Sequence, residues 1–233
     1  MNIALIIAGG IGSRMNNKIP KQFLTVNDKP IIIYTLEKFQ KSKAIDKILV
    51  VTLENWFDYL NSYLLEYKID KVKWIIKGGN SNQESINKGV DFLTNHCNDY
   101  DNIIIHAANR PLIDEHLIDK CIKSCNKYGS GITSLPNIEV ACYSDNGNST
   151  NIEIDRDKLF RIQTPQAFKY FKLKEIYNYA KKENICDCGT AASLMIRKGE
   201  KVYLVEGINL NMKITTPDDL KLFKLIIMNE RSD

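Results

Sequence analysis

The chain has 233 residues, of which 44% are hydrophobic and 26% are charged, as in an ordinary globular protein with one domain or two. The formal net charge is +4, and no long basic run or stripe of Lys, Arg and aromatic residues occurs, so nucleic acid is not an expected partner. No apolar run approaches the roughly 18 residues of a membrane span, and the apolar strand at Ile3 leaves no room for a charged leader, so we expect a cytoplasmic protein without a membrane partner.

The cysteines and histidines give no strong metal signal. Six cysteines lie at positions 97, 121, 125, 142, 186 and 188, and none belongs to a Cys-x-x-Cys motif. Cys121 and Cys125 have helical spacing, so reduced thiols that take part in packing are expected. Cys186-x-Cys188 leaves a metal or redox site as an alternative, whereas the three histidines have no ligand spacing.

The first predicted element is a buried apolar strand at the start of the chain. Gly9, Gly10 and Gly12 then break it into a tight loop, and glycine lets backbone N–H groups come close to a ligand. Arg14 and Lys21 place two cations beside this loop. The combination favours a binding site for a chain of phosphates over an ordinary strand-to-helix turn with solvated charges.

A dinucleotide-binding fingerprint is the nearest alternative, since it also places glycines after a first strand. It requires a third glycine that opens a helix, and an acidic residue about 20 positions later. Here Arg14-Met15 stands where the third glycine would be, and the first acid that ends a second strand is Glu54. We therefore set the dinucleotide hypothesis aside.

Helices and strands alternate along the next part of the chain. The predicted helices begin at Pro30, at Trp56, after a capping box of Ser81 and Glu84, and at Asp114; the predicted strands lie at 45–52, 72–76, 103–105 and 131–135. Because strands that alternate with helices form parallel sheets with right-handed crossovers, we expect an α/β fold.

The pattern changes at residues 137–160, which alternate around Asp145-Asn-Gly147, the strongest short hairpin signal in the chain. We predict an antiparallel β-arm there. Helices near 171–182 and 190–198, a strand at 202–205 and a final helix from Pro217 complete the prediction. No internal repeat or linker occurs, so we expect one domain over residues 1–233 that carries the arm.

Two motifs together resemble a known family. Ala8-Gly-Gly-x-Gly-Ser-Arg-Met15, followed by Pro20-Lys-Gln22, is similar to the signature of the small cytidylyltransferases, which include 2-C-methyl-D-erythritol 4-phosphate and D-ribitol-5-phosphate cytidylyltransferases. The resemblance implies a Rossmann-like, mostly parallel sheet with flanking helices, and a homodimer in which the β-arm crosses a two-fold axis. It also implies CTP and a phosphorylated polyol or sugar as substrates, with Mg²⁺ as the cofactor.

The resemblance also implies roles for individual residues. Nucleotide binding falls to residues of three loops, namely Ala8, Gly9, Gly10, Gly12, Ser13, Gly78, Gly79, Ser85, Ala107 and Arg110. The catalytic cations are Arg14, Lys21 and Lys213. The acceptor phosphate falls to Arg156 of the partner subunit, Lys213 and Thr190. Thr164 also matches the family, in a structural role.

The chain departs from the family pattern at four positions. Ala107 replaces an aspartate that holds the metal and the nucleotide, and Thr190 replaces a second acid. Asn82 stands in place of an arginine of the base-reading loop, and Val140 in place of a threonine that touches the acceptor in the methylerythritol-phosphate enzymes. The metal ligands are therefore unknown, and we expect Mg²⁺ to arrive mainly as Mg·CTP.

The chemistry implied by the resemblance needs no general base, because a phosphate monoester has a second pKa near ~6 and is already ionised at pH 7. Its oxygen attacks the α-phosphorus of CTP, and cations stabilise the crowded phosphates. A ribitol-like acceptor for surface polysaccharide is favoured over methylerythritol because the acceptor positions differ. A non-catalytic nucleotide-binding descendant is the other hypothesis, although retention of Arg14, Lys21, Arg156 and Lys213 favours an enzyme.

Overall fold

The structure is a computed structural model that describes residues 1–10, 19–186 and 188–229. The predictions for Gly12, Ser13 and Arg14 concern residues outside these ranges. No helix in the described part of the chain is both long enough and apolar enough to cross a membrane. All six cysteines lie within the described ranges and have free thiols; Cys121, Cys125 and Cys188 are buried as expected for packing residues, whereas Cys142 and Cys186 are exposed.

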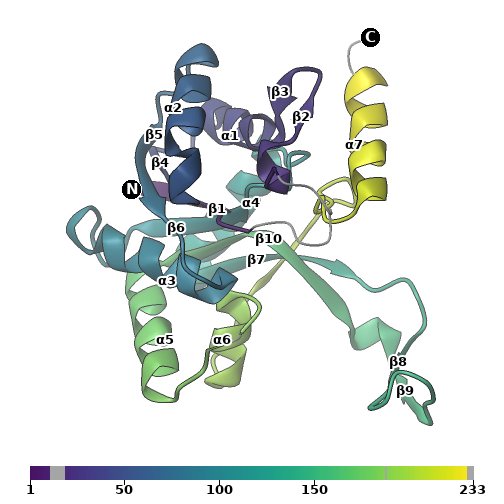
Figure 1. Cartoon of the computed structure of the whole chain (residues 1–233). Helices are drawn as coiled ribbons and strands as arrows, with labels where there is room; N and C mark the ends of the chain where they lie inside the picture. The colour runs from purple at the N-terminus through teal and green to yellow at the C-terminus, as the bar shows by residue number, and fades with distance from the viewer. Residues whose placement is uncertain (11–18, 187, 230–233) are drawn as a thin grey trace.

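A sheet of seven strands lies at the centre of the described residues, in the order β11-β7-β10-β6-β1-β4-β5 (Figure 1). Its strands are β1 (Asn2–Ala8), β4 (Lys47–Thr52), β5 (Val72–Lys77), β6 (Asn102–Ala107), β7 (Ser130–Pro136), β10 (Phe160–Lys169) and β11 (Leu204–Glu206). Neighbouring strands pair in parallel, except that β10 runs antiparallel to both β6 and β7. The arrangement confirms the predicted, mostly parallel α/β fold.

Sequence reasoning missed β10, which it treated as the end of the arm followed by a loop. The strand carries polar side chains and Pro165, and the pairing register with β7 shifts between Ile162 and Gln166. Proline cannot donate to the ladder and argues against a central strand, so the local signal is misleading here. The contacts with β6 and β7 on both sides decide the conformation instead.

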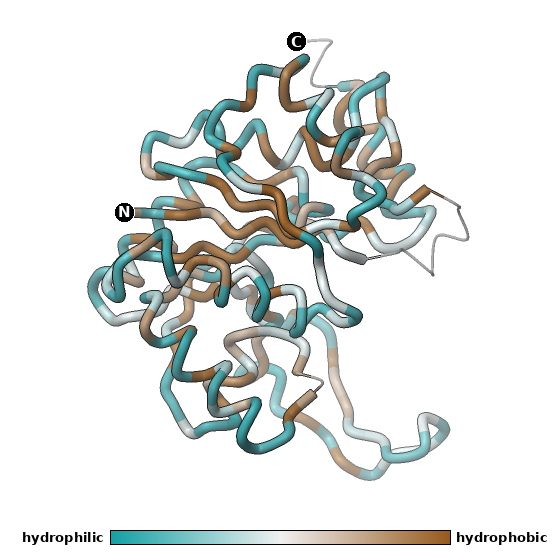
Figure 2. The backbone as a smooth tube through the Cα atoms, turned by 60° about the vertical axis from the view of Figure 1, so that its left-hand side comes forward, coloured by the Kyte–Doolittle hydropathy of each residue, from teal (hydrophilic) through white to brown (hydrophobic). Residues whose placement is uncertain are grey.

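Helices cover both faces of the sheet (Figure 1). On one face lie α1 (Ile31–Lys41), α2 (Phe57–Glu66) and α4 (Glu115–Tyr128); on the other lie α3 (Asn82–Phe92), α5 (Tyr170–Lys182) and α6 (Ala191–Arg197). Alternate side chains of β1 enter the two cores, with Ala4 and Ile6 in the first and Ile3 and Leu5 in the second. Figure 2 shows the apolar strands that result at the centre of the molecule.

Several predicted boundaries shift by a few residues. Pro30 belongs to a short strand, β3 (Lys29–Pro30), and precedes the first residue of α1 instead of opening the helix. The helix predicted from Trp56 begins as a 3-10 turn, η3 (Glu54–Trp56), before α2. Of the residues of α2, only Leu60 is fully buried, so the aromatic stripe packs at the edge of the core.

The predicted cap of α3 is present with a changed partner. The Ser81 hydroxyl accepts a hydrogen bond from the Glu84 N–H at 3.0 Å. The Glu84 carboxylate accepts from the Asn80 N–H at 2.8 Å, one residue before the cap. In a standard capping box it would accept from the N–H of the cap itself. The Glu84 side chain of α3 therefore fixes the loop that leads into the helix, while Ser81 caps the helix itself.

The β-arm is present and projects from the sheet (Figure 1). Its strands β8 (Ala141–Tyr143) and β9 (Ile152–Ile154) pair antiparallel, and a 3-10 turn, η5 (Arg156–Lys158), follows them. Large apolar side chains of the arm are exposed to solvent, namely Ile138, Val140, Tyr143, Ile152 and Phe160. A single chain leaves this surface uncovered.

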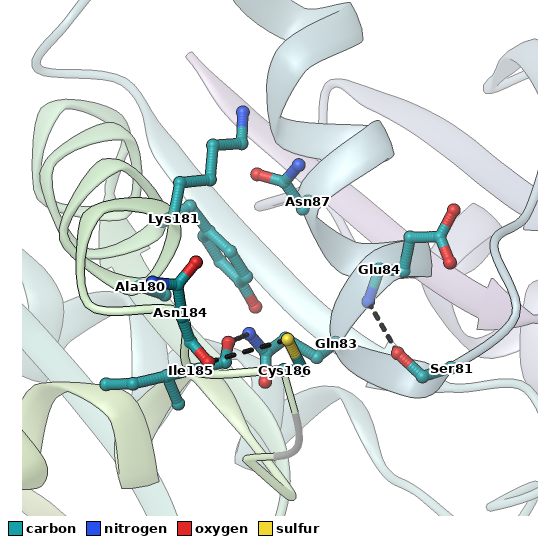
Figure 3. Close-up of a pocket in the computed structure, with 10 residues that line it drawn as sticks. Ser81, Gln83, Glu84, Asn87, Ala180, Lys181, Asn184, Ile185 and Cys186 are labelled. Atoms are coloured by element: carbon teal, nitrogen blue, oxygen red, sulfur yellow. Dashed lines mark hydrogen bonds between the residues drawn. The ribbon is translucent and has the colours of Figure 1, made fainter.

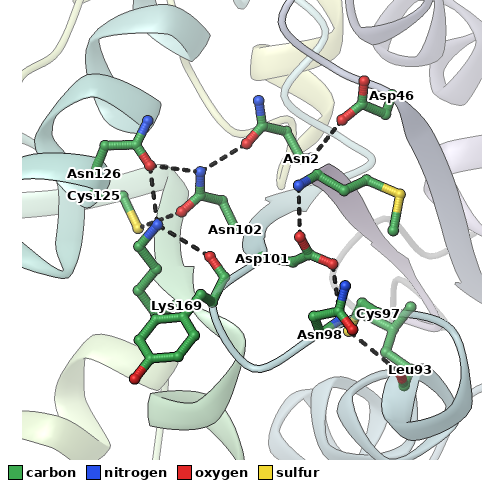
Figure 4. Close-up of polar contacts among 12 residues, drawn as sticks. Asn2, Asp46, Leu93, Cys97, Asn98, Asp101, Asn102, Cys125, Asn126 and Lys169 are labelled. Atoms are coloured by element: carbon green, nitrogen blue, oxygen red, sulfur yellow. Dashed lines mark hydrogen bonds and ion pairs between the residues drawn. The ribbon is translucent and has the colours of Figure 1, made fainter.

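A polar network closes the end of the sheet where β1 and β6 begin (Figure 4). The amino group of Met1 pairs with the Asp101 carboxylate. The Asn102 side-chain amide donates to Asn2 Oδ1 at 2.7 Å and to Asn126 Oδ1 at 2.9 Å. These side chains satisfy one another, so the groups available for chemistry lie at the opposite, carboxyl end.

The contact between α4 and β7 gives a test of the packing. A Cβ added at Gly131 would overlap the carbonyl oxygen of Cys121 and lie 3.0 Å from Ser124 Cβ. We predict that Gly131→Ala lowers the free energy of unfolding in urea by about 2 kcal/mol or more, because backbone atoms must move. Gly189→Ala is the matched control, since nothing lies within 4 Å of its added Cβ and its loss should be small. Equal losses in the two variants would contradict the packing described here.

Candidate active site

Two glycine loops meet at the carboxyl ends of β1 and β5. A Cβ added at Gly9 would lie 3.2 Å from the Ser85 hydroxyl oxygen, and one added at Gly78 would lie 3.1 Å from it. The Gly78 N–H donates to the Thr52 carbonyl at 2.7 Å, and the Gly79 N–H donates to Ser85 Oγ at 3.0 Å. The buried hydroxyl of Ser85 therefore fills the space that side chains at the two glycines would need.

A cavity of about 400 Å³, called here the nucleotide cavity, opens between these loops. It is lined by Ile7, Gly9, Gly10, Leu53, Gly79, Asn80, Ser81, Asn82 and Ser85. Four of the predicted nucleotide-binding residues thus line one cavity, and Gly78 lies directly behind it. The lining combines the apolar side chains of Ile7 and Leu53 with the backbone of the glycines and with polar side chains of residues 80–82 and Ser85, so it offers both apolar contacts and hydrogen-bonding groups to a ligand.

The Pro20-Lys21-Gln22 motif is anchored under the first loop. The Gln22 side chain is buried, and its amide donates to the carbonyl of Ala8, which also accepts from the Thr52 hydroxyl at 3.2 Å. Phe23 stacks on Trp56 with ring centroids 4.5 Å apart. Ala8 therefore acts through its carbonyl as a support of the loop, and Gln22 fixes the position of Lys21 next to it.

A second cavity of about 160 Å³, called here the acceptor cavity, adjoins the first and shares Ile7 and Asn82 with it. Its lining brings together predicted site residues that are far apart in the sequence, namely Ala107, Arg110, Thr164, Thr190 and Lys213. Among the described residues, the lining of both cavities contains two cations, Arg110 and Lys213, and no carboxylate.

The segment that carries Lys213 is held from both sides. The buried amide of Asn211 donates to the Thr164 carbonyl at 2.7 Å, and the Asn211 carbonyl accepts from the Arg110 guanidinium. Ile214 and Asn109 exchange two hydrogen bonds, with the backbone one at 2.9 Å. Burial lowers the pKa of Arg110 to about 10, so its guanidinium stays charged at pH 7.

Asp219 holds the turn that follows Lys213, and the charge of Lys21 acts on its carboxyl group. Its carboxylate accepts from the N–H groups of Thr215 and Thr216, both at 2.8 Å. Partial burial raises the pKa of this carboxyl, but the bonds from Thr216 and Thr215 and the charge of Lys21 outweigh burial and hold the pKa below its usual range. Asp219 is therefore ionised at pH 7 and fixes the turn after Lys213. Sequence reasoning assigned no role to Asp219, Asn211 or Asn109.

Three positions that the sequence analysis singled out make local structural contacts, namely Thr190, Asn82 and Thr164. The Thr190 hydroxyl caps α6 by accepting from the Ser193 N–H at 3.1 Å. The Asn82 amide donates to the Gly189 carbonyl at 3.1 Å, so it ties α3 to the loop before α6. The Thr164 hydroxyl accepts from the Ala107 N–H at 3.2 Å, which agrees with the structural role expected for it.

Of the described predicted site residues, Ala8, Lys21, Gly78 and Arg156 do not line either cavity, and only one of these four, Arg156, lies on the arm. It lies in η5 on the arm, is exposed, and has its Nε 3.8 Å from the Asp157 carboxylate. It does not appear in the lining of the acceptor cavity of its own chain. A role in the site would therefore require a second subunit.

The described residues of the site do not offer a set of protein ligands for a metal ion, and Asp187, which precedes Gly189 and Thr190 in the sequence, lies outside the described residues. Among the described residues, no group of three His, Cys, Asp or Glu side chains is placed to bind one. Asp114, the nearest acid after the loop that follows β6, caps α4 by accepting from the Leu117 N–H at 2.7 Å. Mg²⁺ takes about six oxygen ligands and usually one or two carboxylates, which the described lining does not offer.

Comparison with known proteins agrees with this geometry. The family model described as "IspD: 2-C-methyl-D-erythritol 4-phosphate cytidylyltransferase" matches residues 2–229. A ribitol-5-phosphate cytidylyltransferase of Lacticaseibacillus paracasei is 44% identical over 96% of this chain and 97% of its own length. A 2-C-methyl-D-erythritol 4-phosphate cytidylyltransferase of Clostridium acetobutylicum is 39% identical over 94% of each chain.

Solved structures show the same fold. The 4-diphosphocytidyl-2C-methyl-D-erythritol synthase of Anaerococcus prevotii superposes with a TM-score of 0.82 at 23% identity, covering 97% of this chain and 96% of that one. The Francisella tularensis 2-C-methyl-D-erythritol 4-phosphate cytidylyltransferase superposes with a TM-score of 0.80 at 26% identity, covering 96% and 98%. The chain therefore belongs to the IspD family of CTP-dependent cytidylyltransferases.

Proposed function

We propose that this protein transfers CMP from CTP to D-ribitol 5-phosphate and releases pyrophosphate and CDP-ribitol. The observation that carries the proposal is the pair of adjoining cavities at the carboxyl ends of the strands, with glycine loops in one and Lys213 in the other. The relative named for this reaction also has a higher identity than the methylerythritol-phosphate relative described above. We expect the enzyme to act in the cytoplasm as a single catalytic domain with its β-arm.

The proposed reaction rests on position and charge. A ribitol phosphate oxygen forms a bond to the α-phosphorus of CTP, and the bond from that phosphorus to the bridging oxygen of pyrophosphate breaks. In this proposal Lys213 binds the acceptor phosphate and Arg110 the nucleotide, while the resemblance assigns Lys21 and Arg14 to the triphosphate; Arg14 lies outside the described residues. No proton has to be removed from the nucleophile. His106 does not serve as a base, because burial lowers its pKa to about 3.

The direct test is pyrophosphate release from CTP with a matched set of acceptors. Ribitol 5-phosphate should give the highest kcat/KM, ahead of glycerol 3-phosphate and 2-C-methylerythritol 4-phosphate, and unphosphorylated ribitol should give none. A preference for 2-C-methylerythritol 4-phosphate would contradict the proposal and would assign the protein to isoprenoid synthesis instead. CTP binding without turnover of any acceptor would favour the non-catalytic hypothesis.

We further infer that Mg²⁺ arrives with CTP, because the described lining offers it no carboxylate. Ala107→Asp should therefore lower the Mg²⁺ concentration for half-maximal rate, since it adds a carboxylate to the lining of the acceptor cavity. Ala107→Asn is the matched control of the same size without the charge. An unchanged Mg²⁺ requirement in Ala107→Asp would show that another acid already serves.

We also propose that the arm of one subunit completes the site of another. The arm exposes a run of apolar side chains, and its Arg156 reaches neither cavity of its own chain. These features suit a homodimer in which Arg156 of the partner subunit contacts the acceptor phosphate.

Mixing two inactive variants tests this arrangement. After subunit exchange between Arg156→Ala and Lys213→Ala proteins, half of the dimers are mixed, and each mixed dimer regains one complete site. Activity should rise to about a quarter of the wild-type value. No recovery after verified exchange would contradict the crossing arm.

Asp219 should influence catalysis through Lys21 and through the turn after Lys213. Asp219→Asn should lower kcat on the order of tenfold while leaving CTP binding nearly unchanged, because small displacements of catalytic cations are costly. Asp218→Asn is the control, since Asp218 lies on the same helix but pairs with Lys221 at the surface. The losses of Asp219→Asn and Lys21→Ala should be non-additive, whereas additive losses would show that Asp219 does not act through Lys21.

A further inference from the structure

A third cavity of about 430 Å³, called here the α3–α5 cavity, lies between these two helices and the loop that follows α5 (Figure 3). It is lined by Ser81, Gln83, Glu84, Asn87, Tyr177, Ala180, Lys181, Asn184, Ile185 and Cys186. Its volume is in the range of sites that hold small molecules. The proposed reaction does not involve this cavity, and none of the predicted site residues that the structure describes lines it. Ser81 lines both this cavity and the nucleotide cavity.

Two polar groups of this lining are buried without a partner. Tyr177 is only 3% exposed, and its hydroxyl makes no hydrogen bond with any described residue. The side-chain oxygen of Asn87 is likewise without a partner among the described residues, while its amide nitrogen donates to Asp91 at 3.1 Å. Burial raises the pKa of Tyr177, so the hydroxyl keeps its proton and is available as a donor. Unsatisfied buried polar groups are costly, and a donor and an acceptor in the lining of one cavity form a pattern that a ligand can satisfy.

The charged side chains around the cavity are already engaged. Lys181 pairs with Asp91 at 3.3 Å. Glu84 pairs with Lys88 at 3.2 Å and accepts from the Asn80 N–H. The lining also includes the apolar side chains of Ala180 and Ile185. The cavity therefore suits a neutral ligand with a flat apolar ring better than an ion.

We propose that the α3–α5 cavity binds a small neutral ring with an amide-type edge, in which a C=O accepts from Tyr177 and an adjacent N–H donates to Asn87. Pyrimidine bases have this chemistry. The ligand would enter along the loop at residues 184–186, where Cys186 is exposed.

The cavity is connected to both parts of the candidate site. Ser81 lines it and the nucleotide cavity alike. Gln83 binds the adjacent loop from two sides, since its amide nitrogen donates to the Ile185 carbonyl and its oxygen accepts from the Cys188 N–H at 2.7 Å. The same loop continues into Gly189 and Thr190, which line the acceptor cavity. A ligand in the α3–α5 cavity would therefore change the affinity of the protein for CTP. This effect rests on the proposed function, whereas the binding of the ligand to the cavity does not.

The test measures binding without activity. Uracil is the probe, and 1,3-dimethyluracil is its control of similar shape without N–H donors. With saturating CTP present, uracil should slow the alkylation of Cys186 by iodoacetamide, measured by peptide mass spectrometry. Cys142, which is also exposed but lies on the arm, is the internal reference. The dimethyl compound should protect Cys186 much less than uracil does.

Two variants make the assignment specific. Tyr177→Phe should weaken uracil binding by about fivefold or more, because only the hydroxyl is lost. Tyr179→Phe, the same change two positions along α5 and outside the cavity lining, should leave binding unchanged. Cys186→Trp, which fills the cavity from an exposed position, should abolish binding seen by ligand-observed NMR. Absence of protection by uracil, or equal binding by Tyr177→Phe and wild type, would overturn the proposal.

Discussion

The close approach of two backbones is the constraint on which the nucleotide side of this protein depends. The loop after β1 and the loop after β5 meet where neither carries a side chain, and a Cβ on Gly78 would come 3.6 Å from the Cα of Gly9. The hydroxyl of Ser85 occupies the remaining space and accepts a hydrogen bond from the second loop. Because the parallel strands deliver both loops to one edge, backbone N–H groups from distant parts of the chain line a single cavity.

The acceptor side depends on a different device, a short segment held by asparagines. The Asn211 amide donates to the Thr164 carbonyl of β10, and the Asn109 amide, in the loop after β6, donates to the Ile214 carbonyl, so the backbone is fixed on both sides of Lys213. Side chains that hold backbone in this way fix the place of the lysine in the lining of the acceptor cavity. The surroundings are positive, so an anionic acceptor is favoured while the described lining adds no competing carboxylate.

Much of the fold follows from the sequence because the β1, β4 and β6 strands are apolar runs and their helices have clear caps, such as Ser81 and Asp114. Once the sheet is known to be mostly parallel, the sequence also predicts that Gly9, Gly79 and Lys213 lie at the same edge of it. The side-chain hydrogen bonds that hold the segment of Lys213 could not be predicted in the same way. The bond from Asn211 to Thr164 joins residues 47 positions apart, and no local pattern announces it. For β10, the local sequence argues against a strand, and the segment becomes one because it pairs with β6 on one side and β7 on the other.

The reversed direction of β10 has a consequence for how this architecture can vary. The arm leaves the sheet after β7 and returns at the start of β10, and its neck is closed by the bond from the Asn137 N–H to the Leu159 carbonyl at 2.8 Å. Both ends therefore sit at the carboxyl edge, beside the catalytic cavities, and residues 138–158 form an excursion that the sheet does not need for its register. Lengthening such an excursion is cheap, since each doubling of a flexible loop costs only about 0.6 kcal/mol. Insertions and deletions between β8 and β9 can thus accumulate while the sheet stays unchanged, whereas the proposed contact of Arg156 with a partner subunit constrains the length of the arm after β9.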